Sequence, residues 1–182
     1  MSNQGNHRSI NTDVWFKVRP SHSLDDIAGM EGLKSHLREC GQDSRRYFFC
    51  GSESSGLTYI IEAFVHELMK ADYRYLSIDG SEIAGRYQKQ TESAVKQLFE
   101  TAQENAPCIV AINEVEYICP NRASGERTEQ ERCIADAFLD GFRQIRDTDQ
   151  PVIIICSTNH PNRVDKDLTK DSEMIQLPDL NQ

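Results

Sequence analysis

The chain alternates short apolar runs with longer segments in which apolar residues recur every three or four positions. A short run bounded by turn residues is typical of a buried strand, whereas the longer spacing is typical of one buried helix face. Strand runs occupy residues 47–50, 75–78, 108–112, 152–156 and 174–177, and helix patterns occupy residues 31–40, 57–69, 91–105 and a segment after residue 131. This order predicts an α/β fold, a three-layer αβα sandwich around a mainly parallel five-stranded sheet with right-handed crossovers.

Composition and charge exclude several classes of protein. Of the 182 residues, 38% are hydrophobic and 27% are charged, which is typical of a globular domain rather than a disordered chain. The net charge of −9, with scattered basic residues, argues against a nucleic-acid partner, because phosphate contacts need clustered cations. The longest apolar run is only about five residues, too short for membrane insertion. Residues 1–13 are polar and lack the apolar centre of a secretion signal, so we expect a cytoplasmic protein.

The cysteines and histidines give no sign of a metal site. The six cysteines form no C-x-x-C pair, and none has a spacing to histidine that is typical of zinc ligands. Three cysteines lie in apolar runs, where this residue behaves as a small buried hydrophobe. We therefore expect reduced thiols in the core.

Residues 51–58, GSESSGLT, lie between the first predicted strand of the sheet and a predicted helix, where a phosphate-binding loop would lie. Gly51, Gly56 and Thr58 keep the outline of such a loop, but Leu57 occupies the position of its lysine. Taken alone, the octamer leaves three alternatives open: a nucleotide site, a degraded site, or a chance pattern.

Polar residues follow two later strands at the points where these strands end. Asn113 and Glu114 close one apolar run, and Ser157, Thr158 and Asn159 close another. The carboxyl ends of parallel strands meet at one edge of a sheet, and ligands bind there. We therefore expect these side chains to lie close to the 51–58 loop.

In the order and spacing of these motifs, the chain resembles the large subdomain of AAA-family ATPases, nearest to the katanin and spastin branch, over roughly residues 24–180. The resemblance implies a P-loop NTPase fold with ATP and magnesium as cofactors. It implies nucleotide binding by Ile27, Gly29, Gly51, Ser52, Ser54, Ser55, Gly56, Leu57, Thr58 and Asn113. It also implies that Thr58 and Asn113 would be the magnesium ligands, that Glu114 would polarise the attacking water, and that Asn159 would be the sensor residue.

The resemblance extends to Arg86 and Tyr87, which fall where the family carries a pore loop. In that family a basic residue and an aromatic residue grip a polypeptide in the central channel of a ring. The two residues can equally be an exposed loop pair without this role.

Three departures from the family pattern affect ATP chemistry. Leu57 supplies no charge to a phosphate, and Glu53 adds a carboxylate to a loop that attracts anions. Asn113 replaces the aspartate that holds magnesium, and an amide cannot supply that charge. The run Asp167–Leu168–Thr169–Lys170–Asp171 lacks the arginine fingers that the family places there.

We therefore interpret residues 21–182 as a degenerate AAA core domain, preceded by a polar segment over residues 1–20 and without the helical lid. Its expected role is that of a catalytically impaired pseudoenzyme that binds protein partners or other AAA subunits, and it could be part of a ring oligomer. ATP and magnesium would bind weakly or not at all. The alternative is an active ATPase that remodels protein substrates, with partner subunits where these are needed.

Overall fold

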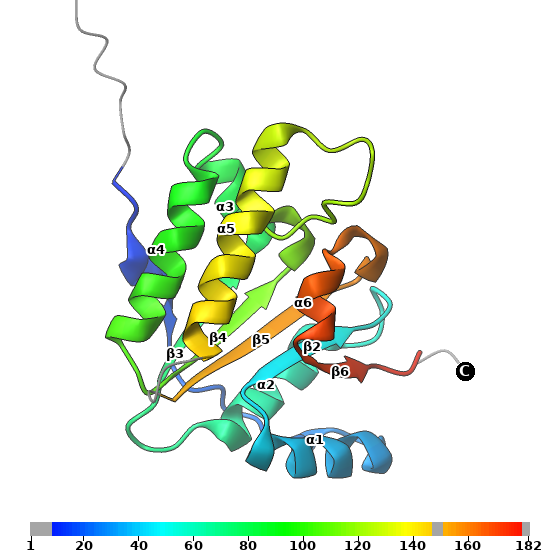
Figure 1. Ribbon diagram of the computed structural model, residues 1–182. Helices are drawn as coiled ribbons and strands as arrows, with labels where there is room; N and C mark the ends of the chain where they lie inside the picture. The colour runs from blue at the N-terminus through cyan, green and yellow to red at the C-terminus, as the bar shows by residue number, and fades with distance from the viewer. Residues whose placement is uncertain (1–8, 147–150, 180–182) are drawn as a thin grey trace, which may run out of the picture.

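A computed structural model describes residues 9–146 and 151–179 as three layers of helix, sheet and helix (Figure 1). The sheet has six strands in the order β1-β3-β4-β5-β2-β6. These strands are β1 (Phe16–Lys17), β2 (Arg46–Cys50), β3 (Arg74–Asp79), β4 (Cys108–Asn113), β5 (Val152–Thr158) and β6 (Glu173–Gln176). All neighbouring pairs are parallel except β1 with β3. The predicted architecture and its five strands are therefore confirmed, and β1 is an additional edge strand.

Helices cover both faces of the sheet. On one face lie α3 (Gly80–Arg86), α4 (Thr91–Glu104) and α5 (Glu129–Arg146), with α6 (Lys166–Lys170), and on the other lie α1 (Glu31–Asp43) and α2 (Leu57–Leu68). Successive strand residues face opposite layers. In β3, for example, Leu76 and Ile78 join the cluster under α4 and α5, whereas Tyr75 joins the cluster under α2.

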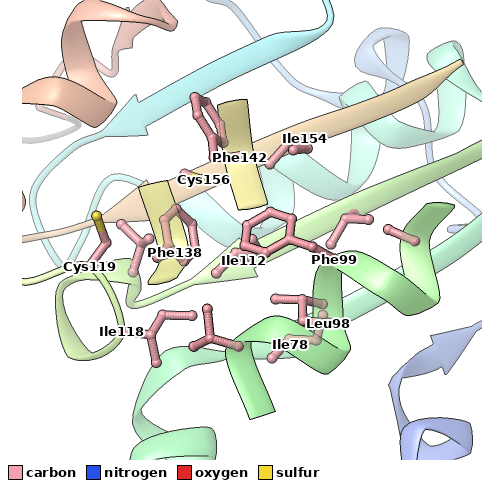
Figure 2. Packing of buried hydrophobic residues seen from close by; sticks show 14 of the residues in the cluster. Ile78, Leu98, Phe99, Ile112, Ile118, Cys119, Phe138, Phe142, Ile154 and Cys156 are labelled. Carbon is pink, nitrogen blue, oxygen red and sulfur yellow. The ribbon is translucent and has the colours of Figure 1, made fainter. Parts of the chain in front are cut away.

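The core under α4 and α5 contains three packed phenylalanine rings (Figure 2). The ring of Phe138 lies 5.2 Å from that of Phe99 and 6.2 Å from that of Phe142, between centroids. A Cβ atom added to Gly141 would lie 2.2 Å from the Phe99 ring, so only glycine lets α5 approach α4 this closely.

Several local features differ from the sequence prediction. Helix α1 continues through Gly41 to Asp43, and Gly41 is where the helix lies against α2: an added Cβ atom would be 3.2 Å from Leu68. The glycine thus serves close packing instead of ending the helix. Helices α3 and α6 have seven and five residues, too few for an apolar period to be recognised.

Part of the segment that was predicted as a polar N-terminal extension joins the fold. Residues 12–15 form a 3₁₀ turn, η1 (Thr12–Trp15), which buries Trp15 to 5% exposure, and β1 then pairs Phe16 with Leu76 of β3. A single large aromatic side chain can bury enough apolar surface to hold a two-residue strand. Residues 1–8 lie outside the described part of the chain.

All six cysteines are free. Cys50, Cys108, Cys119 and Cys156 are buried, as expected for core thiols, whereas Cys133 is exposed. Burial raises the pKa of Cys108 to about 12. In the described part of the chain, no helix has the length and apolar character needed to cross a membrane.

Candidate functional site

The carboxyl ends of β3, β4 and β5 open into a cavity of about 670 Å³, which we call the front cavity. Its lining includes Thr58 from the first turn of α2, Asn113 and Glu114 after β4, and Asn159 after β5. The structure thus brings together these four residues, up to 101 positions apart in the sequence, and Arg86 and Tyr87, predicted for the pore loop, line the same cavity. This convergence follows from the parallel sheet, as expected.

Asn113 is held by hydrogen bonds on both sides. Its side-chain amide donates to Asp79 Oδ1 at 3.1 Å, and its Oδ1 accepts from the Ser157 hydroxyl at 3.1 Å. The amide therefore connects the ends of three adjacent strands, β3, β4 and β5. Both of its polar atoms serve this structural link, and a neutral amide oxygen is a weaker magnesium ligand than the carboxylate it replaces.

Glu114 lies in a special backbone conformation at the mouth of the front cavity. Its φ is 50°, in the left-handed region, and its carboxylate accepts a hydrogen bond from the Ser81 hydroxyl. An added Cβ atom on Gly80 would lie 2.3 Å from the Glu114 carbonyl oxygen. Glycine at the start of α3 therefore lets this helix approach the Glu114 backbone closely.

The 51–58 loop is closed by one of its own serines. The backbone N–H and the hydroxyl of Ser55 both donate to the Ser52 carbonyl oxygen, at 3.0 and 2.7 Å, and Ser55 is fully buried. Gly56 follows with a φ of 71°, a conformation that suits glycine. Ser52, Ser54 and Glu53 lie at the surface of this turn or partly exposed. Because Glu53 is exposed, solvent screens its carboxylate, so the missing lysine charge at Leu57 is the larger effect on the charge of the loop.

Leu57 is part of the hydrophobic core. It is 9% exposed and belongs to the cluster that also contains Leu24, Ile27 and the buried residues of α2. Ile27, which the resemblance placed over adenine, has the same 9% exposure and packs in the same cluster. Gly29 is close by in sequence and has a φ of 70°.

Acidic groups outnumber basic groups around the front cavity. Four carboxylates line it, those of Glu62, Asp79, Glu82 and Glu114, against the two cations Lys17 and Arg86. Arg86 is already paired with Glu82 at 2.6 Å, and the Lys17 ammonium donates to the Val14 carbonyl at 3.1 Å. The cavity thus presents more negative than positive charge to a ligand, which disfavours a polyphosphate.

Tyr87 has a position that the sequence did not predict. Its side chain is 6% exposed and packs in the core cluster beside Ile83, while Arg86 stays exposed. Gripping a polypeptide requires an exposed ring, so the pore-loop role of Arg86 and Tyr87 stays a prediction that this arrangement does not favour.

The run where arginine fingers were looked for belongs to an ion-pair cluster. Arg122 pairs with Asp136 at 2.6 Å, with Asp165 at 2.8 Å and with Asp167 at 2.7 Å. Arg143 adds a contact to Asp167 at 3.3 Å. This cluster ties the segment after β4 to α6, and sequence reasoning missed it because the residues of each ion pair are 14 to 45 positions apart.

Three N-terminal residues of the site were also missed. Val14, Trp15 and Lys17 line the front cavity, although the sequence prediction placed them in a segment outside the core domain. The apolar run over residues 14–16 is the one sequence signal that could have indicated a buried strand there.

The comparisons with known proteins agree with this architecture. A family model described as "ATPase family associated with various cellular activities (AAA)" matches residues 47–178. The Arabidopsis thaliana "Protein SUPPRESSOR OF K(+) TRANSPORT GROWTH DEFECT 1" is 26% identical over 164 residues, which is 82% of this chain and 37% of that protein. The Pongo abelii "Vacuolar protein sorting-associated protein 4B" is 28% identical over 178 residues, 88% of this chain and 39% of that protein. The chain thus spans less than half the length of these relatives.

Solved structures support the fold. The crystal structure of the FIGL-1 AAA domain in complex with ADP superposes with a TM-score of 0.70 at 20% identity, covering 91% of this chain and 59% of that one. A second crystal structure of the FIGL-1 AAA domain superposes with a TM-score of 0.71.

Proposed function

Because this chain belongs to the AAA family, we propose that it is a member with a strongly impaired ATP site, which acts as a structural or protein-interaction module. The observation that carries the proposal is the burial of Leu57 at the lysine position of the phosphate loop. A cation there normally reaches the β and γ oxygens of the nucleotide. Here the loop offers backbone N–H groups without that charge.

Two further observations support impairment. Both polar side-chain atoms of Asn113 are hydrogen-bonded, one to Asp79 and the other to Ser157. The amide also lacks the negative charge of the aspartate that binds magnesium in the family. The acidic residues of the front cavity are not balanced by the two cations near them. Phosphoryl transfer depends on positioning and electrostatic stabilisation, and both are weakened in this arrangement.

A calorimetric titration tests the proposal directly. ATP with magnesium is titrated into the parent chain and into the Glu53→Gly/Leu57→Lys double variant. We expect no measurable heat of ATP binding in the parent and clear binding in the variant. The aliphatic stem of a lysine can stay buried where Leu57 packs, while its ammonium extends toward the loop. Micromolar binding by the parent would overturn the proposal. A Leu57→Met variant is the matched control, since it keeps the apolar contact without adding charge.

The second candidate is an active ATPase that remodels protein substrates, alone or with partner subunits. Thr58, Glu114 and Asn159 favour it, because they line one cavity as an ATP site would require. Turnover by the purified chain above that of a Glu114→Gln variant would support this candidate. If no mixture with partner subunits hydrolyses ATP while a Leu57→Lys chain in the same mixture does, the candidate fails.

This proposal implies that the partners are other proteins, among them further AAA subunits that would neighbour this chain in a ring. A cytoplasmic location is part of the same proposal. It rests on the absence of an apolar run longer than about five residues in the sequence. Size-exclusion chromatography with light scattering would test self-association, with a single monomer peak at all concentrations as the contrary result.

A further inference from the structure

Strand β6 forms one edge of the sheet. It is the last strand in the sheet order, with β2 on one side and no further strand of the described chain on the other (Figure 1). The Leu177 N–H, just after β6, donates to the Cys50 carbonyl of β2 at 2.8 Å. Backbone groups in a strand point alternately to its two sides, so those of Ile175 also face β2. The N–H and C=O groups of Met174 and Gln176 therefore point away from β2, along the open edge.

The outward groups of these two residues are unpaired. In the part of the chain that the structure describes, the backbone N–H and C=O groups of Met174 and Gln176 take part in no hydrogen bond. Both residues are exposed, and the apolar side chain of Met174 adds to this surface with 46% of the residue exposed. Unpaired donors and acceptors at the spacing of a strand are a template for another extended chain. The occupant that matches this edge is thus a polypeptide backbone.

Strand β6 lacks most of the features that protect a sheet edge from pairing. Lysine, proline or a β-bulge within an edge strand discourages an added strand. At the opposite edge of the sheet, β1 has only two residues, and one of them is Lys17. The four residues of β6, Glu173–Gln176, include neither lysine nor proline, and their register with β2 is continuous. Of the two edges, β6 is therefore the one that can accept a strand.

The charge along this edge distinguishes between possible partner strands. Residues 171–179 contain three carboxylates, those of Asp171, Glu173 and Asp179, and no lysine or arginine. The Glu173 carboxylate lies 3.5 Å from a ring nitrogen of His36 and pairs with no lysine or arginine of the described chain. A second copy of this chain would bring the same carboxylates and another net charge of −9 to the interface. A basic segment of a different protein would meet opposite charge instead.

The two faces of the edge favour different side chains on that partner strand. Glu173 and Ile175 face the layer of α1, since Glu173 contacts His36 and Ile175 joins the core cluster under α1 and α2. Met174 lies on the opposite face, because successive side chains alternate. Beside Glu173 a lysine or arginine gains an opposite charge, and beside Met174 a β-branched apolar residue gains apolar contact. A segment in which basic and β-branched apolar residues alternate fits both faces.

We propose that the outer edge of β6 binds an extended basic segment of a partner protein as an additional, antiparallel strand, through the outward backbone groups of Met174 and Gln176. Antiparallel pairing is slightly more stable per residue than parallel pairing. It places an apolar residue of the partner directly opposite Met174, with the backbone groups of that apolar residue bonded to β6. The inference rests on the proposed function only in taking a protein as the partner. No residue of β6 lines the front cavity, so it does not depend on the state of the ATP site.

Amide hydrogen exchange tests this pairing at the atoms concerned. The ¹⁵N-labelled full chain is studied by NMR with and without the blocked peptide acetyl-KVKVKV-amide. In the free chain we expect the N–H groups of Ile175 and Leu177, which bond to β2, to exchange slowly and those of Met174 and Gln176 to exchange fast. With saturating peptide, exchange at Met174 and Gln176 should slow at least about tenfold, since both amides gain an acceptor. No slowing at millimolar peptide would overturn the proposal.

Two methylated peptides separate strand pairing from simple charge attraction. N-methylation of the valines removes the donors that would bond to β6, whereas N-methylation of the lysines removes only donors on the far side of the added strand. Both peptides keep the charge and side chains of KVKVKV. We expect the valine-methylated peptide to lose the protection of Met174 and Gln176, and the lysine-methylated peptide to keep it. Equal behaviour of the two peptides, or the reverse order, would overturn the antiparallel arrangement.

The charge of the partner and a second copy as occupant have their own tests. The peptide EVEVEV keeps the alternation with the opposite charge, and we expect it to bind at least about tenfold more weakly than KVKVKV. Equal or tighter binding of EVEVEV would contradict a basic partner. Protection of the Met174 and Gln176 amides that rises with the concentration of the chain alone would identify a second copy as the occupant, and would overturn the proposal.

A pair of variants locates the binding at β6. Met174→Lys adds a cation to the edge and removes the apolar contact, so it should weaken KVKVKV at least about tenfold while leaving the fold intact, because Met174 is exposed. Val18→Lys is the matched control: Val18 is 88% exposed and follows β1 at the opposite edge. Equal affinities in the two variants would contradict binding at β6. No nucleotide is present, so failure here leaves the ATP-site proposal untouched.

Discussion

The side-chain amide of Asn159 donates a 2.9 Å hydrogen bond to the carbonyl oxygen of Gly51, and so joins the end of β5 to the first residue of the phosphate loop. In the family pattern this asparagine is a sensor for nucleotide. Here it holds the loop to the sheet without any ligand, and its partner carbonyl belongs to a buried residue. The same side chain therefore has a structural role that does not require a bound nucleotide.

An Asn159→Ala substitution should accordingly weaken the fold. We expect the free energy of unfolding to fall by about 1–2 kcal/mol, because the Gly51 carbonyl loses its donor in a buried position. Urea denaturation followed by circular dichroism measures the change. Asn162→Ala, three residues along and exposed, should change stability by no more than about 0.5 kcal/mol. Equal effects of the two substitutions would show that the Asn159 bond is not part of the native structure.

A Gly80→Ala substitution should destabilise the protein through a backbone clash. The added methyl would lie 2.3 Å from the Glu114 carbonyl oxygen, so α3 and the 3₁₀ turn η3 (Val115–Tyr117) must separate, at an expected cost of about 2–3 kcal/mol. Gly85→Ala in the same helix meets no atom within 4 Å and should stabilise by about 0.5–1 kcal/mol. Thermal unfolding of both variants measures this contrast. Two destabilised variants of similar extent would mean that helix propensity, not the approach to Glu114, decides the outcome.

The layers of the fold could be predicted from the sequence because each strand and long helix carries its own apolar pattern. The strand at residues 152–158 is buried at every position, and its apolar run is readable without any knowledge of its neighbours. The same holds for the helix face of α4, where Val95, Leu98 and Ala102 are buried. Such patterns are local, so they can be recognised from the sequence alone.

The site was predictable only in part, because its details depend on contacts between distant residues. The sequence predicted that Thr58, Glu114 and Asn159 would meet, which follows from strand direction alone. It could not predict that Asn113 would lie between Asp79 and Ser157, or that Trp15 would enter the front cavity. Burial of Tyr87 was missed for the same reason: an Arg-Tyr pair in a polar stretch has no local sign of its packing partners.

Loss of Arg122 should destabilise the protein most at neutral pH. Asp165 is 5% exposed, and this burial by itself would raise its pKa. Hydrogen bonds from the Arg122 side chain and from the N–H groups of Arg122 and Asp167 have a larger opposite effect. They hold the pKa of Asp165 below 3.8. Because this pKa is lowered on folding, the contribution to stability is complete above about pH 4–5 and is lost as pH falls below 3.8.

In Arg122→Met we expect a loss of about 2 kcal/mol at pH 7, since a largely buried carboxylate loses its cation. Without the Arg122 hydrogen bonds, burial raises the pKa of Asp165. The difference in free energy of unfolding between the variant and the parent should therefore narrow as the pH falls toward 3. Denaturation midpoints over pH 3–7 test this. Lys96→Ala, which breaks an exposed pair with Glu92, should cost at most about 0.5 kcal/mol at every pH. A gap that stays constant with pH would contradict the role assigned to Asp165.

An Asn113→Asp substitution, which introduces the residue type expected at a magnesium site, should destabilise this chain instead of activating it. The new carboxylate would face Asp79, whose Oδ1 now accepts from the Asn113 amide at 3.1 Å. A hydrogen bond becomes a repulsion between two carboxylates. Because Asp79 is exposed and solvent screens the pair, we expect a cost of about 1–2 kcal/mol at pH 7.

Three measurements separate this cause from simple damage to the fold. The loss in Asn113→Asp should shrink below about pH 4, where one carboxylate takes a proton, and it should shrink in about 1 M salt. The Asp79→Asn/Asn113→Asp double variant places an amide opposite a carboxylate again, so it should recover most of the lost stability. If the double variant is as unstable as the single one, the Asp79–Asn113 bond does not govern this edge of the sheet. ATP turnover by the single variant would show that Asn113 limits the site, contrary to the proposal that Leu57 does.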